Sequence, residues 1–328
     1  MKSLMRKFIP AIILTAAVLL GMALYAEAGP LFAALASFDL RVLPLVLGLV
    51  TLGYGIRYLR WQYYLRLLGI DVPPSASRRI FFSGLSMAIT PGKLGEVLKC
   101  FMLRSNFDVR LALSVPVVVA ERFTDLAGVF VLAALTVVGF SGGGPVLLAA
   151  GVLIGAMVVA ALASGKLVDW AGALLSRTLF ARQEVRIDWA RESAALFRRL
   201  LRGKPLATGG ALAVTAWFLE CLAFLLVIQG FGQDGITLYS ATFTYASATL
   251  AGAFSMLPGG LGATEGSMTV LLAGIGLSRE AATGATLLIR ACTLWWGVLL
   301  GLAAYATFGG GRMPGDIDWS SANRHSDE

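Results

Sequence analysis

The chain has 328 residues, of which 57% are hydrophobic and only 14% are charged, and its formal net charge is +8. Soluble domains contain about 25% charged residues, so this composition excludes an ordinary soluble domain and indicates an integral membrane protein. The apolar runs are long and do not alternate with polar residues, which favours transmembrane helices over a barrel. The basic surplus is typical of cytoplasmic loops near anionic lipid, and we expect no nucleic-acid partner.

The sequence also argues against several kinds of site. Cys100, Cys221 and Cys292 lie far apart in apolar surroundings, and the only histidine, His325, lies in a polar tail. We therefore expect no disulfide, no metal centre and no histidine-based catalysis. The chain also lacks a nucleotide-binding loop of the GxxxxGK[ST] type. No cofactor and no catalytic residue are predicted, so we expect a protein that is not an enzyme.

The N-terminal part contains two predicted spans. Residues 8–26 form the first, although a cleaved signal peptide is an alternative because Ala-Glu-Ala follows the apolar run. Residues 40–57 form the second and lead into RYLRWQYYLRLLGI, residues 57–70, where arginine mixes with tryptophan and tyrosine. Such a mixture predicts a helix at the membrane interface, most simply an anchor.

The next segment is too interrupted to form one span. Two apolar runs, 80–89 and 97–103, flank the sequence TPGKLGEVLK. Each run holds about ten residues, roughly 15 Å of helix, which is half the hydrocarbon thickness. Basic residues stand at both ends of the segment, namely Arg78, Arg79, Arg104 and Arg110. The pattern predicts a re-entrant hairpin that enters from the cytoplasm.

The rest of the chain alternates apolar runs with polar connections. A second broken segment, 238–276, is interrupted by LPGGLGATEG. A basic cytoplasmic segment, 164–205, has amphipathic helical spacing in part. Further spans are predicted at residues 111–140, 145–163, 205–228 and 279–308. Nearly all Lys and Arg residues then lie on one side, which predicts that both termini are cytoplasmic.

The two interruptions resemble each other. PGKLGE, residues 91–96, corresponds to PGGLGATE, residues 258–265, and an arginine in a later span follows each, Arg122 and Arg290. Because the two segments have opposite predicted topologies, they indicate an inverted-topology repeat. The expected fold is an all-α polytopic membrane protein with about six full transmembrane helices and two re-entrant hairpins. Its single transmembrane domain covers residues 1–308, with repeat 1 at 40–163, repeat 2 at 206–308 and a polar cytoplasmic tail at 309–328.

Charged residues at membrane depth are costly unless paired, and they mark candidate functional sites. Arginine forks suit phosphate, and glycine-rich breaks expose backbone N–H groups to anions. We predict a polar mid-membrane cavity that binds a phosphate-bearing headgroup through Lys93, Glu96, Glu121, Arg122, Asp125, Glu265 and Arg290, with Glu220 as another carboxylate partner. The expected hairpin tips are Pro91, Gly92, Gly95, Pro258, Gly259, Gly260 and Gly262. The alternative is that the Glu–Arg pairs only hold the hairpins against their neighbours.

Three phrases carry a family resemblance: TPGKLGEVLKCFMLR, ERFTDLAGV and the stretch that begins LPGGLGATEG. From about residue 8 to residue 308 the chain resembles the lysylphosphatidylglycerol synthase transmembrane, or flippase-like, family. The family pattern maps onto Pro91, Lys93, Gly95, Glu96, Glu121, Arg122, Asp125, Pro258, Gly259, Gly260, Gly262, Glu265 and Arg290. The resemblance implies a membrane domain that moves a lipid between leaflets, joined in some members to an aminoacyl transferase domain. We expect no such domain here, because the chain ends shortly after the last span.

Two functions fit these expectations. The first is a lipid translocator that moves an anionic or phosphate-bearing envelope lipid across the bacterial inner membrane. The second is a non-transporting membrane partner of an enzyme that makes envelope lipids or polyprenyl-linked glycans, with residues 164–205 as its contact surface.

Overall fold

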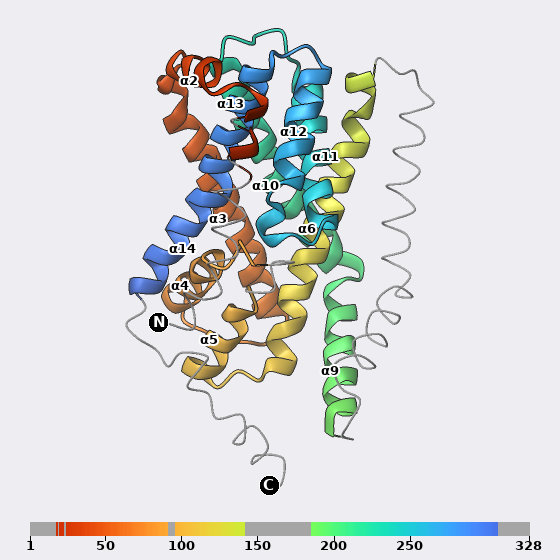
Figure 1. Cartoon of the computed structure of the whole chain (residues 1–328). Helices are drawn as coiled ribbons and strands as arrows, with labels where there is room; N and C mark the ends of the chain where they lie inside the picture. Colours follow the sequence, from red (N-terminus) through yellow and green to blue (C-terminus); the bar gives the residue numbers. More distant parts are fainter. Residues whose placement is uncertain (1–17, 19, 23, 91–95, 142–184, 308–328) are drawn as a thin grey trace.

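The computed structural model describes residues 18, 20–22, 24–90, 96–141 and 185–307 (Figure 1). These residues form helices and no strand, which agrees with an all-α membrane protein. In chain order the α-helices are α2 (Ala28–Ala36), α3 (Leu43–Leu67), α4 (Pro74–Leu85), α5 (Leu98–Phe107), α6 (Leu111–Ser141), α9 (Val185–Leu200), α10 (Gly203–Gly230), α11 (Leu238–Phe254), α12 (Ala263–Gly274), α13 (Arg279–Arg290) and α14 (Trp296–Thr307). Short 3-10 helices, η1 (Leu40–Val42) and η3 (Pro258–Gly260), and a π-helix, η4 (Ala291–Trp295), complete the set.

Several helices match the predicted spans. Among the described residues, three stretches are long and apolar enough to cross a bilayer: Leu40–Leu67, Gly203–Gly230 and Arg279–Thr307. Helix α6 has 31 residues and is therefore about 46 Å long, at 1.5 Å per residue. It corresponds to the predicted span 111–140. The predicted span 145–163 lies outside the described residues, as does most of the predicted span 8–26.

The predicted interfacial helix after residue 57 is wrong. Helix α3 continues without a break to Leu67, and Arg57, Arg60, Trp61 and Tyr64 are buried inside the protein. Three of the four have protein partners: Arg57 bonds to Glu220, Arg60 bonds to Asp125, and the indole of Trp61 donates to Ser77 Oγ at 3.1 Å. Because other helices supply these hydrogen bonds, the side chains have no need of the lipid headgroups.

Two pairs of shorter helices occupy opposite ends of the molecule. Helices α4 and α5, the first broken pair, lie in the lower half of Figure 1, whereas α11 and α12, the second broken pair, lie in the upper half. They coincide with the two interrupted segments of the sequence. Their entry from opposite ends is the geometry that an inverted repeat requires, and their re-entrant position in a bilayer stays a prediction.

The tip of the second broken pair is built on glycine. Gly259 and Gly260 have φ angles of +61° and +68°, a region that residues with a side chain rarely adopt. A Cβ on Gly260 would also lie 2.7 Å from Thr264 Oγ1. The tip of the first pair, with Pro91, Gly92, Lys93 and Gly95, lies outside the described residues.

Two hydrophobic clusters flank the charged residues of α3. Val46 and Val50 pack into one cluster with α10 to α13, and Trp61 and Leu65 pack into the other with α4, α5 and α6. Arg57 and Arg60 lie between the two on the same helix. The polar site therefore sits midway along α3, enclosed by apolar packing on both sides.

Candidate functional site

A cavity of about 360 Å³ lies between the two broken pairs. Residues of α3, α6, α10, α11 and the α13–α14 region line it, together with the ends of both broken pairs. Its polar and aromatic lining includes Tyr54, Arg57, Glu96, Arg122, Asp125, Trp217, Glu220, Tyr245 and Arg290. The cavity therefore combines residues from both halves of the sequence.

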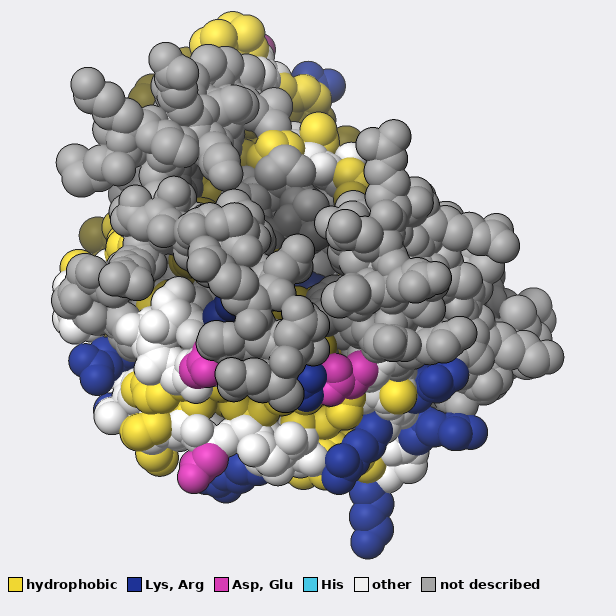
Figure 2. Space-filling model, turned by 90° about the horizontal axis from the view of Figure 1, so that it is seen from below, with side chains coloured by type: hydrophobic (Ala, Val, Ile, Leu, Met, Phe, Trp, Pro, Cys, Tyr) yellow, Lys and Arg dark blue, Asp and Glu magenta, His cyan; other side chains and the backbone are white. Residues whose placement is uncertain are grey.

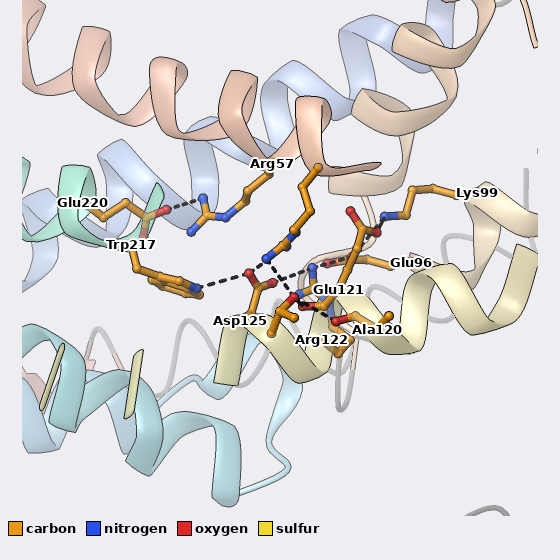
Figure 3. A network of polar contacts seen from close by, with 11 residues as sticks. Arg57, Glu96, Lys99, Ala120, Glu121, Arg122, Asp125, Trp217 and Glu220 are labelled. Carbon is orange, nitrogen blue, oxygen red and sulfur yellow. Dashed lines mark hydrogen bonds and ion pairs between the residues drawn. The ribbon is translucent and has the colours of Figure 1, made fainter. Parts of the chain in front are cut away.

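Asp125 on α6 joins three helices. Its Oδ1 lies 2.8 Å from Arg60 Nη2 and accepts a hydrogen bond from Trp217 Nε1 at 3.3 Å (Figure 3). Its Oδ2 lies 2.9 Å from Arg122 Nη2, one turn away on the same helix. A buried carboxylate needs such partners to offset the loss of hydration. Asp125 thus ties α3 and α10 to α6.

Lys99 on α5 is the second buried cation that contacts α6. Its Nζ lies 2.6 Å from Glu121 Oε2 and 3.6 Å from Glu96 Oε2, and Glu96 Oε2 lies 3.1 Å from Arg122 Nη2. The ammonium also lies 4.6 Å from the ring centroid of Trp61, within the range of a cation–π interaction. These contacts hold the first broken pair against the centre of α6.

Glu220 on α10 completes the group of buried charges. Arg57 Nη1 lies 2.5 Å from its Oε1, and the hydroxyl of Tyr245 donates to its Oε2 at 2.6 Å. The guanidinium carbon of Arg57 also lies 4.5 Å from the centroid of the Trp217 ring. We define the ion-pair cluster as Arg57, Arg60, Glu96, Lys99, Glu121, Arg122, Asp125 and Glu220.

A separate ion pair joins α13 to α12 of the second broken pair. Arg290 Nε donates to Glu265 Oε1 at 2.5 Å, and its Nη2 donates to the carbonyl of Gly259 at 2.7 Å. Glu265 Oε2 accepts from the backbone N–H of Gly262 at 2.6 Å, at the start of α12. One carboxylate therefore caps a helix and orients an arginine at the same time.

The π-helix η4 begins directly after Arg290. Such helices are rare and often occur at functional sites. Tyr54 donates to the carbonyl of Thr293 within it at 2.8 Å. Gly297 gives that tyrosine room, because a Cβ there would lie 2.6 Å from its hydroxyl oxygen. The interaction fixes the backbone next to Arg290.

The structure brings most of the predicted residues together. Glu96, Arg122, Asp125, Arg290, Gly259 and Gly260 line the cavity, and Glu121 and Glu265 are ion-pair partners just behind it. Gly262 bonds to Glu265, and Pro258 forms part of η3 at the second tip. Lys93, Pro91, Gly92 and Gly95 lie outside the described residues. For all the predicted site residues, described or not, a role in substrate binding stays a prediction.

Sequence reasoning missed part of the site. It assigned Arg57 and Arg60 to the membrane interface and did not select Lys99, Tyr54, Trp217 or Tyr245. One signal was available: Arg57 and Arg60 are three residues apart and therefore share a helix face with Trp61 and Tyr64. Their partners, Glu220 and Asp125, are far away in the sequence, so no local pattern identifies them.

The opening of the cavity differs in character from its interior. Four of the described lining residues are exposed at the surface, and all four are apolar: Leu126, Ala253, Met256 and Leu257. They belong to α6 and to the end of α11 with the turn that follows it. A charged interior therefore opens through an apolar mouth between α6 and the second broken pair.

Comparison with known proteins identifies related membrane proteins. The model of the lysylphosphatidylglycerol synthase TM region matches residues 11–301, which include both broken pairs and the whole cavity. A UPF0104 membrane protein of Methanothermobacter thermautotrophicus is 27% identical over 274 residues, which cover 76% of this chain and 80% of the relative. Another UPF0104 membrane protein of that organism is 33% identical over 100 residues, covering 30% of this chain and 29% of the relative.

Proposed function

Because the chain belongs to the family of the lysylphosphatidylglycerol synthase TM region, we propose that it moves an anionic, phosphate-bearing lipid between the leaflets of the cell membrane. In this proposal the protein carries the lipid without changing it chemically. The headgroup enters the cavity, and the acyl chains stay in the bilayer.

The observation that carries the proposal is the contrast between the charged interior and the apolar mouth. A soluble ion would have to cross Leu126, Ala253, Met256 and Leu257, where it gains no hydration. An amphiphile fits both parts at once, since its headgroup replaces water inside while its chains contact the apolar rim. The cavity thus favours a lipid over a soluble substrate.

The proposed phosphate ligands are Arg122 and Arg290. Both line the cavity and both keep part of the side chain exposed, 29% for Arg122 and 15% for Arg290. Guanidinium groups form forked, charge-assisted hydrogen bonds with phosphate. Glu96 and Glu265 orient them, and these pairs also keep the arginines neutralised when no lipid is bound.

The distribution of charge supports an orientation. Figure 2 shows the lower end of the molecule with many Lys and Arg side chains at its rim. Exposed basic residues of α3, α4 and the α5–α6 connection in the lower half of Figure 1 are Arg66, Arg78, Arg79 and Arg110, whereas Arg41 and Arg279 belong to the opposite end. By the positive-inside rule we propose that the lower end faces the cytoplasm. The first broken pair then enters from the cytoplasm and the second from outside, as alternating access between inverted repeats requires.

A leaflet-exchange assay tests the proposed function. Purified protein is placed in phosphatidylcholine vesicles that contain fluorescent phosphatidylglycerol, and the rate of exchange is compared with that of protein-free vesicles. The double variant Glu96→Gln/Arg122→Gln removes both members of one pair, so no unpaired buried charge remains to unfold the protein. We expect the wild type to accelerate exchange and the double variant to abolish most of that acceleration.

The control variant is Arg41→Gln, which removes an exposed arginine far from the cavity and should exchange lipid at the wild-type rate. Unchanged exchange in the double variant would refute the role of Arg122. If the wild type accelerates no phosphate-bearing lipid, the translocator proposal fails and the alternative of a non-transporting membrane partner gains support.

A further inference from the structure

Resting on the proposed translocation, we infer that the cavity binds one proton together with each anionic headgroup, and that the carboxylate of Glu96 holds this proton. The proton comes from the aqueous phase on the side where the cavity is open, and it leaves with the lipid on the other side. Lipid and proton therefore move in the same direction, and a pH gradient supplies the driving force.

The first reason is the charge balance of the buried groups. The ion-pair cluster and the Glu265–Arg290 pair together contain as many cations as carboxylates, namely Arg57, Arg60, Lys99, Arg122 and Arg290 against Glu96, Glu121, Asp125, Glu220 and Glu265. An anionic headgroup adds a negative charge to this neutral set, and such a charge is costly in a site flanked by apolar packing. A bound proton restores neutrality.

Only a carboxylate can take up that proton. Arginine and lysine are already protonated, and the phenols of Tyr54 and Tyr245 are already neutral. Of the described carboxylates, three line the cavity and can exchange a proton with solvent that enters it: Glu96, Asp125 and Glu220.

Glu96 is the lining carboxylate whose contacts a proton disturbs least. Its Oε2 lies 3.6 Å from Lys99 Nζ and 3.1 Å from Arg122 Nη2 (Figure 3). Each of these cations lies closer to a second carboxylate, Lys99 to Glu121 at 2.6 Å and Arg122 to Asp125 at 2.9 Å. Protonation of Glu96 therefore leaves both cations paired.

The other two lining carboxylates are held by arginines that they do not share. Asp125 lies 2.8 Å from Arg60, and Glu220 lies 2.5 Å from Arg57. In the part of the chain that the structure describes, neither arginine has another carboxylate within 4 Å. A proton on Asp125 or Glu220 would therefore leave a buried guanidinium without its counter-charge, which is strongly unfavourable.

The surroundings of Glu96 also favour an added proton. The charged and titratable groups around it come from α3, α5, α6, α10, α11 and α13: Tyr54, Arg57, Lys99, Glu121, Arg122, Asp125, Glu220, Tyr245 and Arg290. Glu96 and Glu121 share the ammonium of Lys99, and Oε1 of Glu121 is buried with no hydrogen-bond partner among the described residues. This corner of the cluster therefore has fewer donors than its carboxylates can accept from.

The position of Arg122 links the proton to the headgroup. A phosphate at this guanidinium competes with Glu96 for it, and a protonated Glu96 competes less strongly than a charged one. Anion binding therefore favours protonation, and protonation favours anion binding to the same extent.

Calorimetry tests the proton without any transport. Short-chain phosphatidylglycerol is titrated into detergent-solubilised protein in buffers of different ionisation enthalpy, and the dependence of the observed enthalpy on the buffer gives the number of protons taken up. Because the bound state holds the extra proton, we expect uptake of about one proton per lipid, with affinity that falls about tenfold for each pH unit of increase where uptake is complete. Buffer-independent enthalpies between about pH 5 and 8 overturn the inference, and Lys93 is then the first candidate for the balancing charge.

Glu96→Gln assigns the proton, because glutamine has the shape of a protonated glutamate and does not titrate. The variant leaves Lys99 paired with Glu121 and Arg122 paired with Asp125, so we expect it to fold. It should take up no proton and bind the lipid with an affinity that does not change with pH. The control Asp234→Asn removes an exposed carboxylate and should behave as the wild type does. Proton uptake that persists in Glu96→Gln overturns the assignment to Glu96.

Vesicles with a pH gradient test the coupling to transport. We expect the wild type to accumulate fluorescent phosphatidylglycerol in the leaflet that faces the alkaline side, beyond the level in protein-free vesicles and whatever the orientation of the protein. Equal filling of both leaflets by a protein that does exchange lipid overturns the coupling. Proton-linked binding without exchange refutes translocation and leaves the proton site standing. Exchange with binding that takes up no proton refutes the inference and leaves the proposed function standing.

Discussion

At the scale of single residues, the buried charges act as structural links before any ligand arrives. Asp125 contacts Arg60, Arg122 and the indole of Trp217, so one carboxylate joins α3, α6 and α10. Breaking a buried pair by removing one partner typically costs about 3–5 kcal/mol, because the other charge stays buried without compensation. Substitutions in the site therefore affect stability as well as function, and charge-matched variants are needed to separate the two.

Glu265 offers a test of the structural role of the buried charges. We expect Glu265→Ala to lower the free energy of unfolding by about 3 kcal/mol or more, because it removes the cap of α12 and leaves Arg290 unpaired. A thermal melt in detergent measures the effect. The control is Asp234→Asn, which removes an exposed carboxylate from the α10–α11 connection. Equal melting temperatures for the two variants would contradict a structural role of the Glu265–Arg290 pair.

At the scale of elements, the α13–η4–α14 region connects the two halves. Helix α13 contacts the second broken pair, where Thr269 Oγ1 donates to Thr286 Oγ1 at 3.2 Å. Helix α14 packs against α4 of the first pair. The π-helix lies between these two contacts, beside Arg290, and Tyr54 binds its backbone. A movement of Arg290 is thereby linked to both broken pairs.

The contact between α14 and α4 depends on Gly301. A Cβ at this position would lie 2.2 Å from the backbone nitrogen of Ser86, and a backbone atom has no freedom to move aside. We expect Gly301→Ala to destabilise the protein by about 1–3 kcal/mol, as overpacking does, and to slow lipid exchange because α14 moves away from α4. Thermal melting and the vesicle assay measure both effects.

Gly48 provides the matched control for this substitution. It also lies inside a helix, α3, but a Cβ there would meet nothing within 4 Å. Gly48→Ala should therefore be neutral or slightly stabilising, since alanine favours the helix by up to about 1 kcal/mol. If both variants melt alike, the close approach of α14 to α4 is not what makes Gly301 necessary.

At the scale of the whole molecule, one polar cavity is enclosed by two broken pairs that enter from opposite ends (Figure 1). Apolar clusters lie on either side of the ion-pair cluster, so the buried charges are confined to the middle of the protein. The cluster that contains Val46 and Val50 of α3 also contains residues of α10 to α13, so apolar packing joins the two halves of the sequence.

The proposed orientation has its own test. Asp234→Cys lies in an exposed connection at the upper end, and Arg110→Cys lies in the exposed connection between α5 and α6 at the lower end. A membrane-impermeant thiol reagent applied to intact cells should label the first variant, and it should label the second only after permeabilisation. The native Cys100, Cys221 and Cys292 are buried, so their background labelling should be low. Labelling with the opposite pattern would reverse the proposed topology.

The sequence by itself determined much of the architecture. Span position depends on local apolar length, and α3, α6, α10 and α13–α14 overlap predicted spans 40–57, 111–140, 205–228 and 279–308. The two Pro-Gly breaks also coincide with the two broken pairs, because proline followed by glycine, with further glycines close by, disfavours a continuous helix. Even the matched Glu–Arg pairs could be found, since the similarity of the two phrases is visible in the chain.

Only the tertiary structure decided what Arg57, Arg60 and Lys99 do. Arginine beside tryptophan and tyrosine has the same local pattern at a membrane surface and in a buried ion-pair cluster. The difference lies in the partner: Glu220 is 163 positions from Arg57, and Asp125 is 65 positions from Arg60. A charge stays inside the protein only when packing brings an opposite charge within a few ångströms, and that distance is a property of the folded chain.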